Sequence, residues 1–227
     1  MKTAVLLQAR INSQRLARKI LLPLSGLSVI EHCMVNLRNI EVNHHILLCD
    51  YYSYRTLEPY AEKQGFEIFC GPTNDVLKRF AMAVRYFKID MVIRATADNP
   101  LVSSEIANEL VSIYKKEKVD YSVYHDVPKG VSVDVFNGEL ILEVDSEVYK
   151  DDIFDREHVA YKYIRENDWR FDIKDNPAPE KWHAPDLKVS IDTLEEYNFV
   201  QNIFTDLYEE EELSVEEIIK WYKSEKN

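Results

Sequence analysis

The chain is short of basic residues, long apolar runs, cysteine and glycine, and each shortage excludes a class of protein. It carries 28 Lys and Arg against 40 Asp and Glu, a formal net charge of −12 over 227 residues. Duplex nucleic acid and anionic membranes reward broad basic surfaces, so neither is expected as the main partner. No stretch of about 18 uncharged apolar residues exists for a membrane span, and the amino-terminal apolar run is too short for a signal peptide. We therefore expect a cytoplasmic protein.

Cysteine and glycine are too few to build the common sites that depend on them. Cys33, Cys49 and Cys70 are odd in number, lack CxxC spacing and fall inside expected helices or strands. They are expected as buried free thiols, which fits a reducing cytoplasm. The five glycines form neither standard phosphate-binding pattern, GxGxxG or GxxxxGK followed by Ser or Thr. Any phosphate site in this chain must be built from other residues.

The first thirty residues oppose the overall charge. They contain no Asp or Glu but five cations, which are Lys2, Arg10, Arg15, Arg18 and Lys19. Four of these follow the apolar run of residues 3–7 within one ten-residue stretch. Open α/β sheets bind their ligands outside the carboxyl ends of the strands. The pattern therefore predicts an anion site after the first strand, with a polyphosphate as its natural occupant.

Apolar strands and amphipathic helices alternate through the first half of the chain. The expected strands are residues 3–7, 46–49, 66–70 and 91–93. The expected helices begin after Ser28, span about 54–64 with Gly65 as the end, and run from a cap at Thr73 or Asn74 to residue 87. Such alternation implies right-handed crossovers and a mostly parallel sheet with helices on both faces. A hydrophobic content of 46% allows one domain with a sizeable core.

The second half is less regular and is expected to be of mixed α+β type. Its expected helices are residues 104–118, 152–165 and two closing helices, and its expected strands are 121–124, 131–136 and 187–191. Pro177, Pro179 and Pro185 mark a loop, and the acidic run 209–212 is expected as a solvated helix edge. The aromatic residues at 121, 124, 136, 161 and 163 are more typical of a core than of a pocket.

Three loop segments of this arrangement can form one site for nucleotidyl transfer. That chemistry needs cations around phosphates and a metal ion held by carboxylates. The groups that would hold phosphate oxygens are Arg10, Ser13, Arg15, Lys19 and backbone N–H groups. Asp98 and Asp192 each follow an expected apolar strand, so a shared sheet edge would bring them together across Mg²⁺.

Each of these residues also has a simpler interpretation. Loop cations are usually only solvated, and an Asp after a strand most often caps the next helix, as the residues after Asp192 indicate. His158 suits a general acid or base, but a histidine paired with a carboxylate at a helix start is commoner. We assign no chemistry to His158 or to its neighbours Asp155, Arg156 and Glu157.

Six segments, in order along the chain, resemble the cytidylyltransferase family. They are residues 8–19 with 22–24 and 30–32, residues 71–80, residues 94–101, residues 133–136, residues 156–159, and Asp192 with Thr193. The resemblance is strongest to the spore coat polysaccharide biosynthesis protein F group, with 3-deoxy-manno-octulosonate and acylneuraminate cytidylyltransferases as relatives. It spans roughly residues 3–200. Six landmarks in the same order are difficult to produce by chance.

The resemblance implies a fold, a reaction and a set of residues. The fold is the nucleotide-diphospho-sugar transferase fold of the glycosyltransferase A type, a three-layer α/β/α sandwich with a mostly parallel central sheet. The reaction transfers CMP from CTP to an acidic sugar or similar acceptor with release of pyrophosphate, uses Mg²⁺ and serves surface-polysaccharide precursor synthesis. One domain over residues 1–227 would divide into a nucleotide half, about 1–100, and an acceptor half, about 101–227; a homodimer is also expected.

The same resemblance assigns roles by position. Arg10, Arg15 and Lys19 match the catalytic cations, and the triphosphate loop comprises Ala9, Arg10, Ser13, Arg15 and Lys19. Asp98 and Asp192 match the magnesium ligands, and residues 71–75, with Gly71 and Asp75, match the segment that meets base and ribose.

The chain departs from the family at two places in the expected site. Ala17-Arg18 stands where the family commonly has Pro-Gly, and Ala97 where it often has Gly. These departures leave the shape of the loop open. Two alternative functions also stay open, a glycosyltransferase of the same fold that uses a nucleotide sugar, and a nucleotide-binding relative without turnover.

Overall fold

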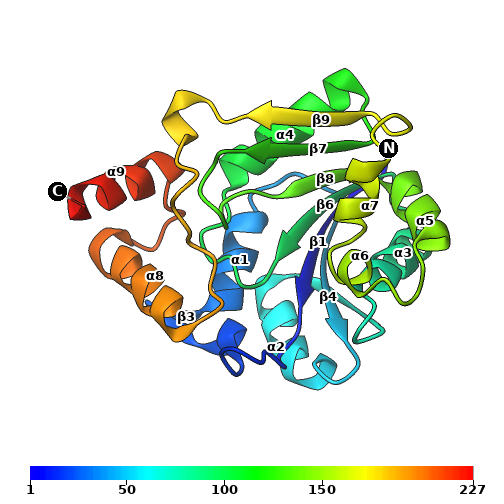
Figure 1. Cartoon of the computed structure of the whole chain (residues 1–227). Coiled ribbons are helices and arrows are strands. Elements are labelled where there is room, and N and C mark those ends of the chain that lie inside the picture. The colour runs from blue at the N-terminus through cyan, green and yellow to red at the C-terminus, as the bar shows by residue number, and fades with distance from the viewer. Residues whose placement is uncertain (227) are drawn as a thin grey trace.

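The computed structural model describes residues 1–226, and in that range seven strands form one twisted sheet (Figure 1). The strands are β1 (Thr3–Ala9), β4 (His44–Asp50), β5 (Glu67–Gly71), β6 (Met91–Thr96), β7 (Tyr121–His125), β8 (Asp134–Asn137) and β9 (Ile173–Pro177). Their order is β5-β4-β1-β6-β8-β7-β9. All neighbours pair in parallel except at β8, which runs antiparallel to both β6 and β7. The predicted mostly parallel sheet is confirmed.

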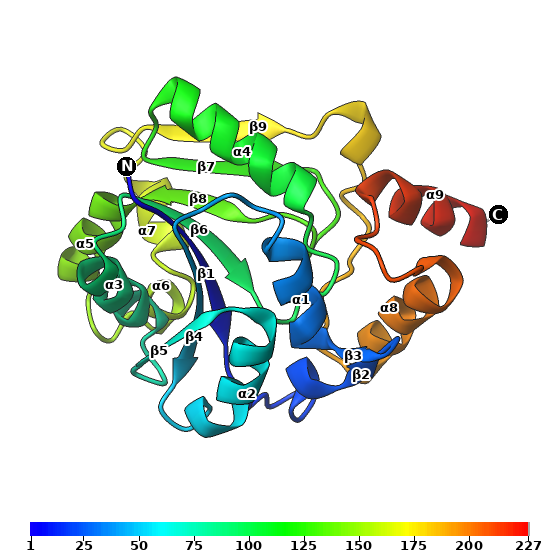
Figure 2. The same ribbon diagram turned by 180° about the vertical axis from the view of Figure 1, so that it is seen from behind.

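Helices cover both faces of this sheet, so the predicted three-layer arrangement is confirmed (Figures 1 and 2). One face carries α1 (Val29–Leu37), α2 (Tyr54–Gln64) and α4 (Ser104–Glu117), and the other carries α3 (Val76–Phe87), α5 (Gly138–Glu147) and α7 (Tyr161–Glu166). The last two helices, α8 (Leu194–Leu207) and α9 (Val215–Glu225), extend the first layer. A short hairpin of β2 (Pro23–Leu24) and β3 (Leu27–Ser28) precedes α1.

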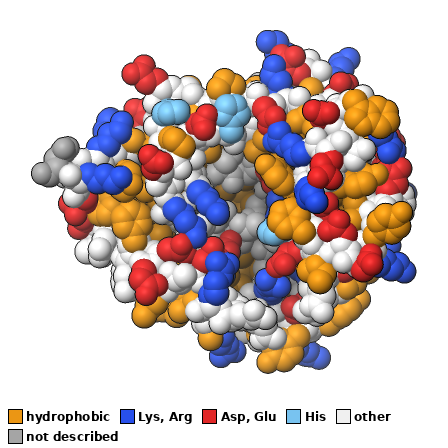
Figure 3. Space-filling view, in the orientation of Figure 1, with side chains coloured by type: hydrophobic (Ala, Val, Ile, Leu, Met, Phe, Trp, Pro, Cys, Tyr) orange, Lys and Arg blue, Asp and Glu red, His pale blue; other side chains and the backbone are white. Residues whose placement is uncertain are grey.

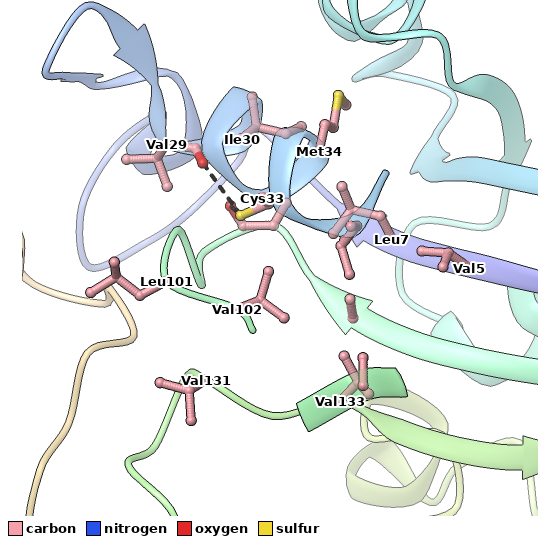
Figure 4. Packing of buried hydrophobic residues seen from close by; sticks show 14 of the residues in the cluster. Val5, Leu7, Val29, Ile30, Cys33, Met34, Leu101, Val102, Val131 and Val133 are labelled. Atoms are coloured by element: carbon pink, nitrogen blue, oxygen red, sulfur yellow. Dashed lines mark hydrogen bonds between the residues drawn. The ribbon is translucent and has the colours of Figure 1, made fainter. Parts of the chain in front are cut away.

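Strand β1 contributes side chains to two hydrophobic cores, one on each face of the sheet. Its side chains alternate between the faces, so Val5 and Leu7 join the core beneath α1, while Ala4 and Leu6 join the core beneath α3. Figure 4 shows Val5 and Leu7 of β1 in the same cluster as Cys33 of α1. All five side chains are completely buried. A strand buried on both faces reads as a continuous apolar run, which is how it appears in the sequence.

The structure bears on two expectations from the sequence, which concern the state of the cysteines and the lack of a membrane span. The three cysteines are free thiols, with Cys33 and Cys49 buried and Cys70 half-buried. Cys49 and Cys70 lie opposite each other on β4 and β5 with their sulfur atoms 3.7 Å apart. Within residues 1–226, no helix combines the length and the apolar character that crossing a bilayer requires.

The helix ends in the first half follow the expected signals with one correction. Helix α2 ends at Gly65, whose φ of +72° is the left-handed conformation that glycine adopts readily. Ser28 caps α1 in a reciprocal capping box with Glu31. The prediction of Thr73 or Asn74 as the cap of α3 is wrong. Asp75 has this role, because its carboxylate accepts a hydrogen bond from the Lys78 backbone N–H at 2.9 Å.

The second half differs more from the prediction. The expected helix over 152–165 is two helices, α6 (Ile153–Glu157) and α7, because Val159 and Ala160 take left-handed φ values of +57° and +59°. Helix α5 and strand β9 were not predicted, and the expected strand over 131–136 begins only at Asp134. Strand β9 ends at Pro177, which an edge strand tolerates because one side of it lacks a ladder.

Residues 187–191 are not a strand of the central sheet, which corrects the prediction. They form an extended segment with a single parallel bridge between Lys129 and Lys188. The Lys129 N–H donates to the Leu187 carbonyl and the Val189 N–H donates to the Lys129 carbonyl, both at 2.8 Å. A loop after β7 therefore replaces the sheet as the support for this segment.

The acidic run over 209–212 is not a helix edge but the connection between α8 and α9. Residues 209–211 are exposed, as expected for solvated charges. Glu212 differs, because its carboxylate accepts hydrogen bonds from the Ser104 backbone N–H and hydroxyl, both at 2.6 Å, at the start of α4. The core interpretation is confirmed for Tyr121, Tyr124 and Phe136, whereas Tyr161 is exposed.

The buried carboxylate of Glu31 yields a prediction for stability in acid. Burial alone would raise its pKa, but hydrogen bonds from Lys63 and Ser28 lower the pKa from 4.5 to about 2. A carboxyl group with a depressed pKa stabilises the folded state above its unfolded pKa and loses that effect as the pH falls toward the folded value. We expect Glu31→Gln to lower the free energy of unfolding by about 1–3 kcal/mol at pH 7, and the deficit to shrink between pH 4.5 and pH 2.

Urea denaturation followed by circular dichroism at several pH values measures this difference. The control is Glu209→Gln, which changes an exposed loop carboxylate and should leave the free energy of unfolding unchanged. If Glu31→Gln lowered the free energy of unfolding equally at pH 7 and at pH 3, the lowered pKa of Glu31 would be contradicted.

Candidate functional site

A cleft of about 720 Å³ opens where β1 and β6 end. The space-filling view shows it as the hollow at the centre of one face, with Lys and Arg side chains gathered beside Asp and Glu on its rim (Figure 3). The carboxyl ends of parallel strands are the usual place for a ligand in an open α/β sheet. Local excess of cations in an acidic protein makes this cleft the candidate site.

The basic loop after β1 enters the cleft from a fixed starting point. The backbone N–H of Ile11 donates to the buried Ser53 hydroxyl at 3.0 Å, and the Ser53 N–H donates to the Asp50 carboxylate at 2.7 Å. This buried relay ties the start of the loop to the end of β4. The predicted loop residues that line the cleft are Ala9, Arg10, Ser13, Arg15 and Lys19.

The departure at Ala17-Arg18 places an arginine in a left-handed backbone conformation. Arg18 takes a φ of +53°, the left-handed region, directly before a 3₁₀ turn over Lys19–Leu21. A glycine adopts this conformation freely, whereas another L-residue adopts it at about 1–2 kcal/mol. The Arg18 side chain is exposed and is not among the cleft-lining residues of the described range 1–226. The second departure, Ala97, is buried in the cleft wall and donates its N–H to the Gln8 carbonyl at 3.0 Å.

Lys19 lies between the two aspartates that the sequence singles out. Its ammonium donates to Asp98 Oδ2 at 2.6 Å and to Asp192 Oδ1 at 2.8 Å. A third bond of 2.7 Å reaches the Ile191 carbonyl. The Lys19 side chain is only 11% exposed, so the two carboxylates and the ammonium form a close, largely desolvated cluster. The structure thus brings Asp98 and Asp192 together from segments 94 positions apart.

The two aspartates meet through their loops rather than along a sheet edge. The Ile191 N–H donates to the Asp98 carbonyl at 2.9 Å, which joins the end of β6 directly to the 187–191 segment. The capping interpretation of Asp192 is wrong. Thr193 caps α8 in a capping box with Glu196, and this leaves the Asp192 carboxylate to accept from cations instead.

Three cations surround the Asp192 carboxylate. Oδ1 accepts from Arg15 and Lys19, both at 2.8 Å, and Oδ2 accepts from Lys188 at 3.1 Å. Burial would raise the pKa of Asp192, but the hydrogen bonds from Lys19 and Lys188 lower it from 3.8 to about 2. The group is therefore fully ionised near neutral pH, and it is available to any cation that displaces the amines.

The carboxylate pair has the donor chemistry that Mg²⁺ requires. Within residues 1–226, no cluster of three or more His, Cys, Asp or Glu side chains forms a closed metal site. Mg²⁺ is usually held by one or two carboxylates together with substrate phosphates and water. Asp98 and Asp192 fit this requirement, on the condition that the Lys19 ammonium moves from the position between them.

The buried Arg79 side chain determines the conformation of residues 71–75. A Cβ on Gly71 would lie 2.7 Å from Cγ of Arg79. The Arg79 guanidinium in turn donates to the carbonyls of Pro72 at 2.9 Å and Thr73 at 3.2 Å. Gly71 is therefore required for the turn to close over Arg79, and Arg79 itself lines the cleft.

Asp75 has a supporting position. Besides capping α3, its carboxylate accepts two hydrogen bonds from Arg156, at 2.8 and 2.7 Å. Arg156 is 4% exposed and also donates to Asp145 at 2.9 Å. Of the described residues 1–226, Val76 and Arg79 line the cleft whereas Gly71 and Asp75 do not. This ionic network joins α3, α5 and α6 behind the cleft wall.

In the segment 155–158, Asp155 and Arg156 stabilise neighbouring helices, whereas Glu157 and His158 line the cleft. The buried Asp155 carboxylate accepts from the backbone N–H groups of residues 162 and 163, at 2.8 and 3.0 Å, and so fixes the start of α7. Glu157 and His158 line the cleft, where Glu157 pairs with Arg10 at 2.8 Å. His158 follows the end of α6 rather than starting a helix, and its ring packs on Phe154 at a centroid distance of 4.5 Å. Burial and nearby arginines lower its pKa, so the imidazole is largely neutral at pH 7.

Several cleft residues were not assigned to the site from the sequence. They are Arg79, Arg94, Asn99, Lys129, Gly130 and Ser190. The first three lie inside segments that carry the family resemblance, so that signal was available. Lys129 and Gly130 reach the cleft because the loop after β7 contacts the 187–191 segment. No local sequence pattern predicts a contact between two irregular segments.

Comparisons with known proteins identify relatives of this chain. Residues 4–226 match the family model described as cytidylyltransferase. The chain is 29% identical to the spore coat polysaccharide biosynthesis protein SpsF of Bacillus subtilis, over 94% of this chain and 91% of that protein. It is 28% identical to the uncharacterized protein MJ1063 of Methanocaldococcus jannaschii, over 87% of this chain and 81% of that protein.

Solved structures of similar proteins have the same architecture. A cytidylyltransferase from Leptospira borgpetersenii superposes with a TM-score of 0.90 at 25% identity, covering 100% of this chain and 95% of that chain. A CMP:2-keto-3-deoxy-manno-octonic acid synthetase complexed with CTP gives 0.70 at 12% identity, covering 91% of this chain and 99% of that chain. The expected nucleotide-diphospho-sugar transferase fold is confirmed. With a family model matched over nearly its entire length, the chain belongs to the cytidylyltransferase family.

Proposed function

We propose that this cytidylyltransferase transfers CMP from CTP to an acidic sugar or similar acceptor and releases pyrophosphate, with Mg²⁺, in the synthesis of surface-polysaccharide precursors. The observation that carries the proposal is the Lys19 ammonium held between Asp98 and Asp192 in a cation-lined cleft. Similarity to a protein named for spore coat polysaccharide biosynthesis supports the biological setting.

The basic loop supplies groups suited to a triphosphate. Arg10 and Arg15 present planar forks of N–H donors, while Lys19 presents a compact charge and Ser13 a hydroxyl. Arg15 is 67% exposed and pairs with Asp192 across the cleft. Such an exposed pair is weak, so phosphate oxygens can replace the carboxylate as the partner of Arg15. CTP would then enter by exchanging the ion pairs of the loop.

The aspartates supply groups suited to the metal ion. When bound there, Mg²⁺ would offset the negative charge that develops on the α-phosphate and on the departing pyrophosphate. Lys19 would exchange its two carboxylate partners for phosphate oxygens at the same time. Since the ammonium otherwise lies between the carboxylates, metal and nucleotide are expected to bind together rather than separately.

The reaction needs positioning more than proton transfer. An oxygen of the acceptor attacks the α-phosphorus, the bond from that phosphorus to the oxygen bridging to the β-phosphate breaks, and pyrophosphate leaves with the electron pair. An acceptor oxygen that is already ionised needs no strong general base. The residues from the second half that line the cleft, including Lys129, Glu157 and His158, supply the acceptor side of this proposal.

The backbone conformation of the basic loop favours turnover over a purely binding role. The noncatalytic alternative arose from the change at Ala17-Arg18, yet Arg18 adopts the backbone conformation that a glycine would take. A glycosyltransferase of the same fold would use the same carboxylates, and pyrophosphate release separates the two reactions. The family resemblance also supports a homodimer, and the free thiols are compatible with a cytoplasmic setting.

The direct test measures pyrophosphate release from each nucleoside triphosphate with Mg²⁺ and a panel of acidic sugars. Release with CTP, together with thermal stabilisation by CTP beyond that of ATP, GTP and UTP, is the expected result. Stabilisation by CTP without turnover on any acceptor would contradict the catalytic proposal and favour the binding role.

Lys19→Met provides a prediction for catalysis. Removal of one preorganised cation from the transition-state environment should lower kcat by about 10²–10³-fold. The matched control is Arg18→Met, which removes a neighbouring cation whose side chain is exposed outside the cleft and should change kcat by less than about twofold. Steady-state pyrophosphate release measures both variants. Comparable kcat values for Lys19→Met and Arg18→Met would contradict the role of Lys19.

The position of Lys19 also yields a prediction for metal binding without turnover. Wild-type protein should bind Mn²⁺ weakly alone and more tightly with CTP, because the ammonium leaves the carboxylates only when phosphates receive it. Lys19→Met should raise the nucleotide-free affinity for Mn²⁺ by about tenfold or more, since a like charge is removed. Electron paramagnetic resonance of free Mn²⁺ measures this. Asp98→Asn should remove the gain in the double variant, and an unchanged Mn²⁺ affinity in Lys19→Met would refute the exchange.

A further inference from the structure

Two polar groups of the cleft have no partner among residues 1–226. The exposed Lys129 side chain lines the cleft and makes no ion pair or hydrogen bond within that range. Ser190 also lines the cleft, is only 6% exposed, and its buried hydroxyl has no hydrogen-bond partner there. A buried hydroxyl without a partner loses free energy, so such a group is typical of a site completed by a ligand.

The other cations of the cleft are already paired. Arg10 contacts Glu157 at 2.8 Å, and Arg94 contacts Asp134 at 2.7 Å. Arg15 and Lys19 contact the aspartates described above. Within residues 1–226, Lys129 is thus the one lysine or arginine in the cleft with no protein partner to be displaced. An anion that binds Lys129 gains a charge interaction without breaking another.

The sheet order places Lys129 on the side of the cleft away from α3 and beyond Lys19. Arg79 and Val76 belong to α3, which follows β5 at one edge of the sheet. Lys19 lies beyond the end of β1, and Lys129 follows β7, three strands farther along the sheet order. With the base side at α3 and the phosphates at Lys19, the β7 end of the cleft is left for the acceptor.

Gly130 holds Lys129 and Ser190 next to each other. Its φ is +110°, and a Cβ there would lie 2.7 Å from the Ser190 nitrogen. The two loops can therefore approach closely enough for the Ser190 N–H to donate to the Lys129 carbonyl at 3.2 Å. The unpaired ammonium and the unpartnered hydroxyl come from adjacent, mutually fixed backbones.

A small recess adjoins the cleft and is lined by neutral polar groups and by the Arg94–Asp134 ion pair. It has a volume of about 140 Å³ and shares Arg94, Thr96 and Asn99 with the cleft. Ser132, from the segment between Lys129 and β8, lines it as well. This volume equals that of about five liquid water molecules. Hydroxyl and amide groups around a space of that size suit the hydroxyl groups of a sugar.

We propose that Lys129 and Ser190 bind the anionic group of the acceptor, a sugar carboxylate or sugar phosphate, while the recess at Thr96, Asn99 and Ser132 receives its hydroxyl groups. This inference rests on the proposed function and assigns the acceptor's acidic group to named residues. A carboxylate and a phosphate both accept hydrogen bonds from an ammonium and a hydroxyl. Lys129 is a specificity-determining residue that contributes little to CTP binding.

The kinetic test compares Lys129→Met with Lys150→Met, a matched change of an exposed lysine in the α5–α6 connection. The acceptor probes are 3-deoxy-manno-octulosonate, N-acetylneuraminate, glucuronate and glucose 1-phosphate, with glucose and glucuronamide as neutral counterparts. Lys129→Met should raise KM for the active anionic probe by about 10- to 100-fold and leave KM for CTP within about twofold. Lys150→Met should change neither value. The probe that responds distinguishes carboxylate from phosphate.

Ser190→Ala separates ligand binding from a structural role. Removing a buried hydroxyl that has no protein partner should leave the melting temperature unchanged or slightly raised. The same variant should raise acceptor KM by about 2- to 10-fold without affecting KM for CTP. An unchanged acceptor KM in this variant would remove Ser190 from the site.

Three results would overturn the assignment of Lys129. They are a rise in KM for CTP as large as that for the acceptor, equal use of a neutral counterpart, and an unchanged acceptor KM in Lys129→Met. If no probe supports pyrophosphate release, the proposed reaction fails on this panel, and calorimetric titration of the anionic probes still decides the inference. Tighter binding to wild type than to Lys129→Met would support it, and equal binding or none would overturn it.

Discussion

The cluster of one ammonium and two carboxylates is the interaction on which the site depends. Lys19 satisfies Asp98 and Asp192 together and also holds the Ile191 carbonyl. Without that cation, two ionised carboxylates would face each other in a partly desolvated cleft, and their repulsion would separate the loops that carry them. The same cation lies where a divalent metal would bind. In the proposed function, the cluster would therefore stabilise the site in the absence of nucleotide and exclude free metal until a triphosphate receives the lysine.

The sheet sets the direction of the cleft, but contacts between loops set its chemistry. Asp98 follows β6 directly, whereas Asp192 reaches it through an extended segment that is supported by Lys129 and joined to Asp98 by a backbone hydrogen bond. The buried network of Asp75, Arg156 and Asp145 fixes the helices behind the wall. Breaking one partner of such a network leaves an uncompensated buried charge, so the network supports the shape of the cleft from behind its wall.

The sequence was sufficient for the features that repeat locally. Alternation of apolar strands and helices predicted the parallel part of the sheet, and the cation-rich loop lies in the candidate cleft. It was not sufficient where distant segments decide the structure. Val159 and Ala160 break a helix at residues whose types do not signal a break, and Lys129 and Ser190 meet only because two irregular loops pack together. The role of Asp192 was obscured because Thr193, one residue later, supplies the cap. Glu31 and His32 within a resemblance segment are structural, with Glu31 capping α1 and His32 packed on Phe204.

Anchoring both ends of the basic loop has a consequence for ligand affinity. Its start is tied to Ser53 and its end continues into a hydrogen-bonded 3₁₀ turn, so both ends of the stretch between Ile11 and Lys19 are fixed. Ordering a backbone residue opposes binding by roughly 1–2 kcal/mol of conformational entropy. Most of that loss occurs here during folding rather than when an anion arrives. In the proposed triphosphate site, this loop without glycine would thus be preorganised, because its two fixed ends replace the close backbone approach that glycine-rich loops use.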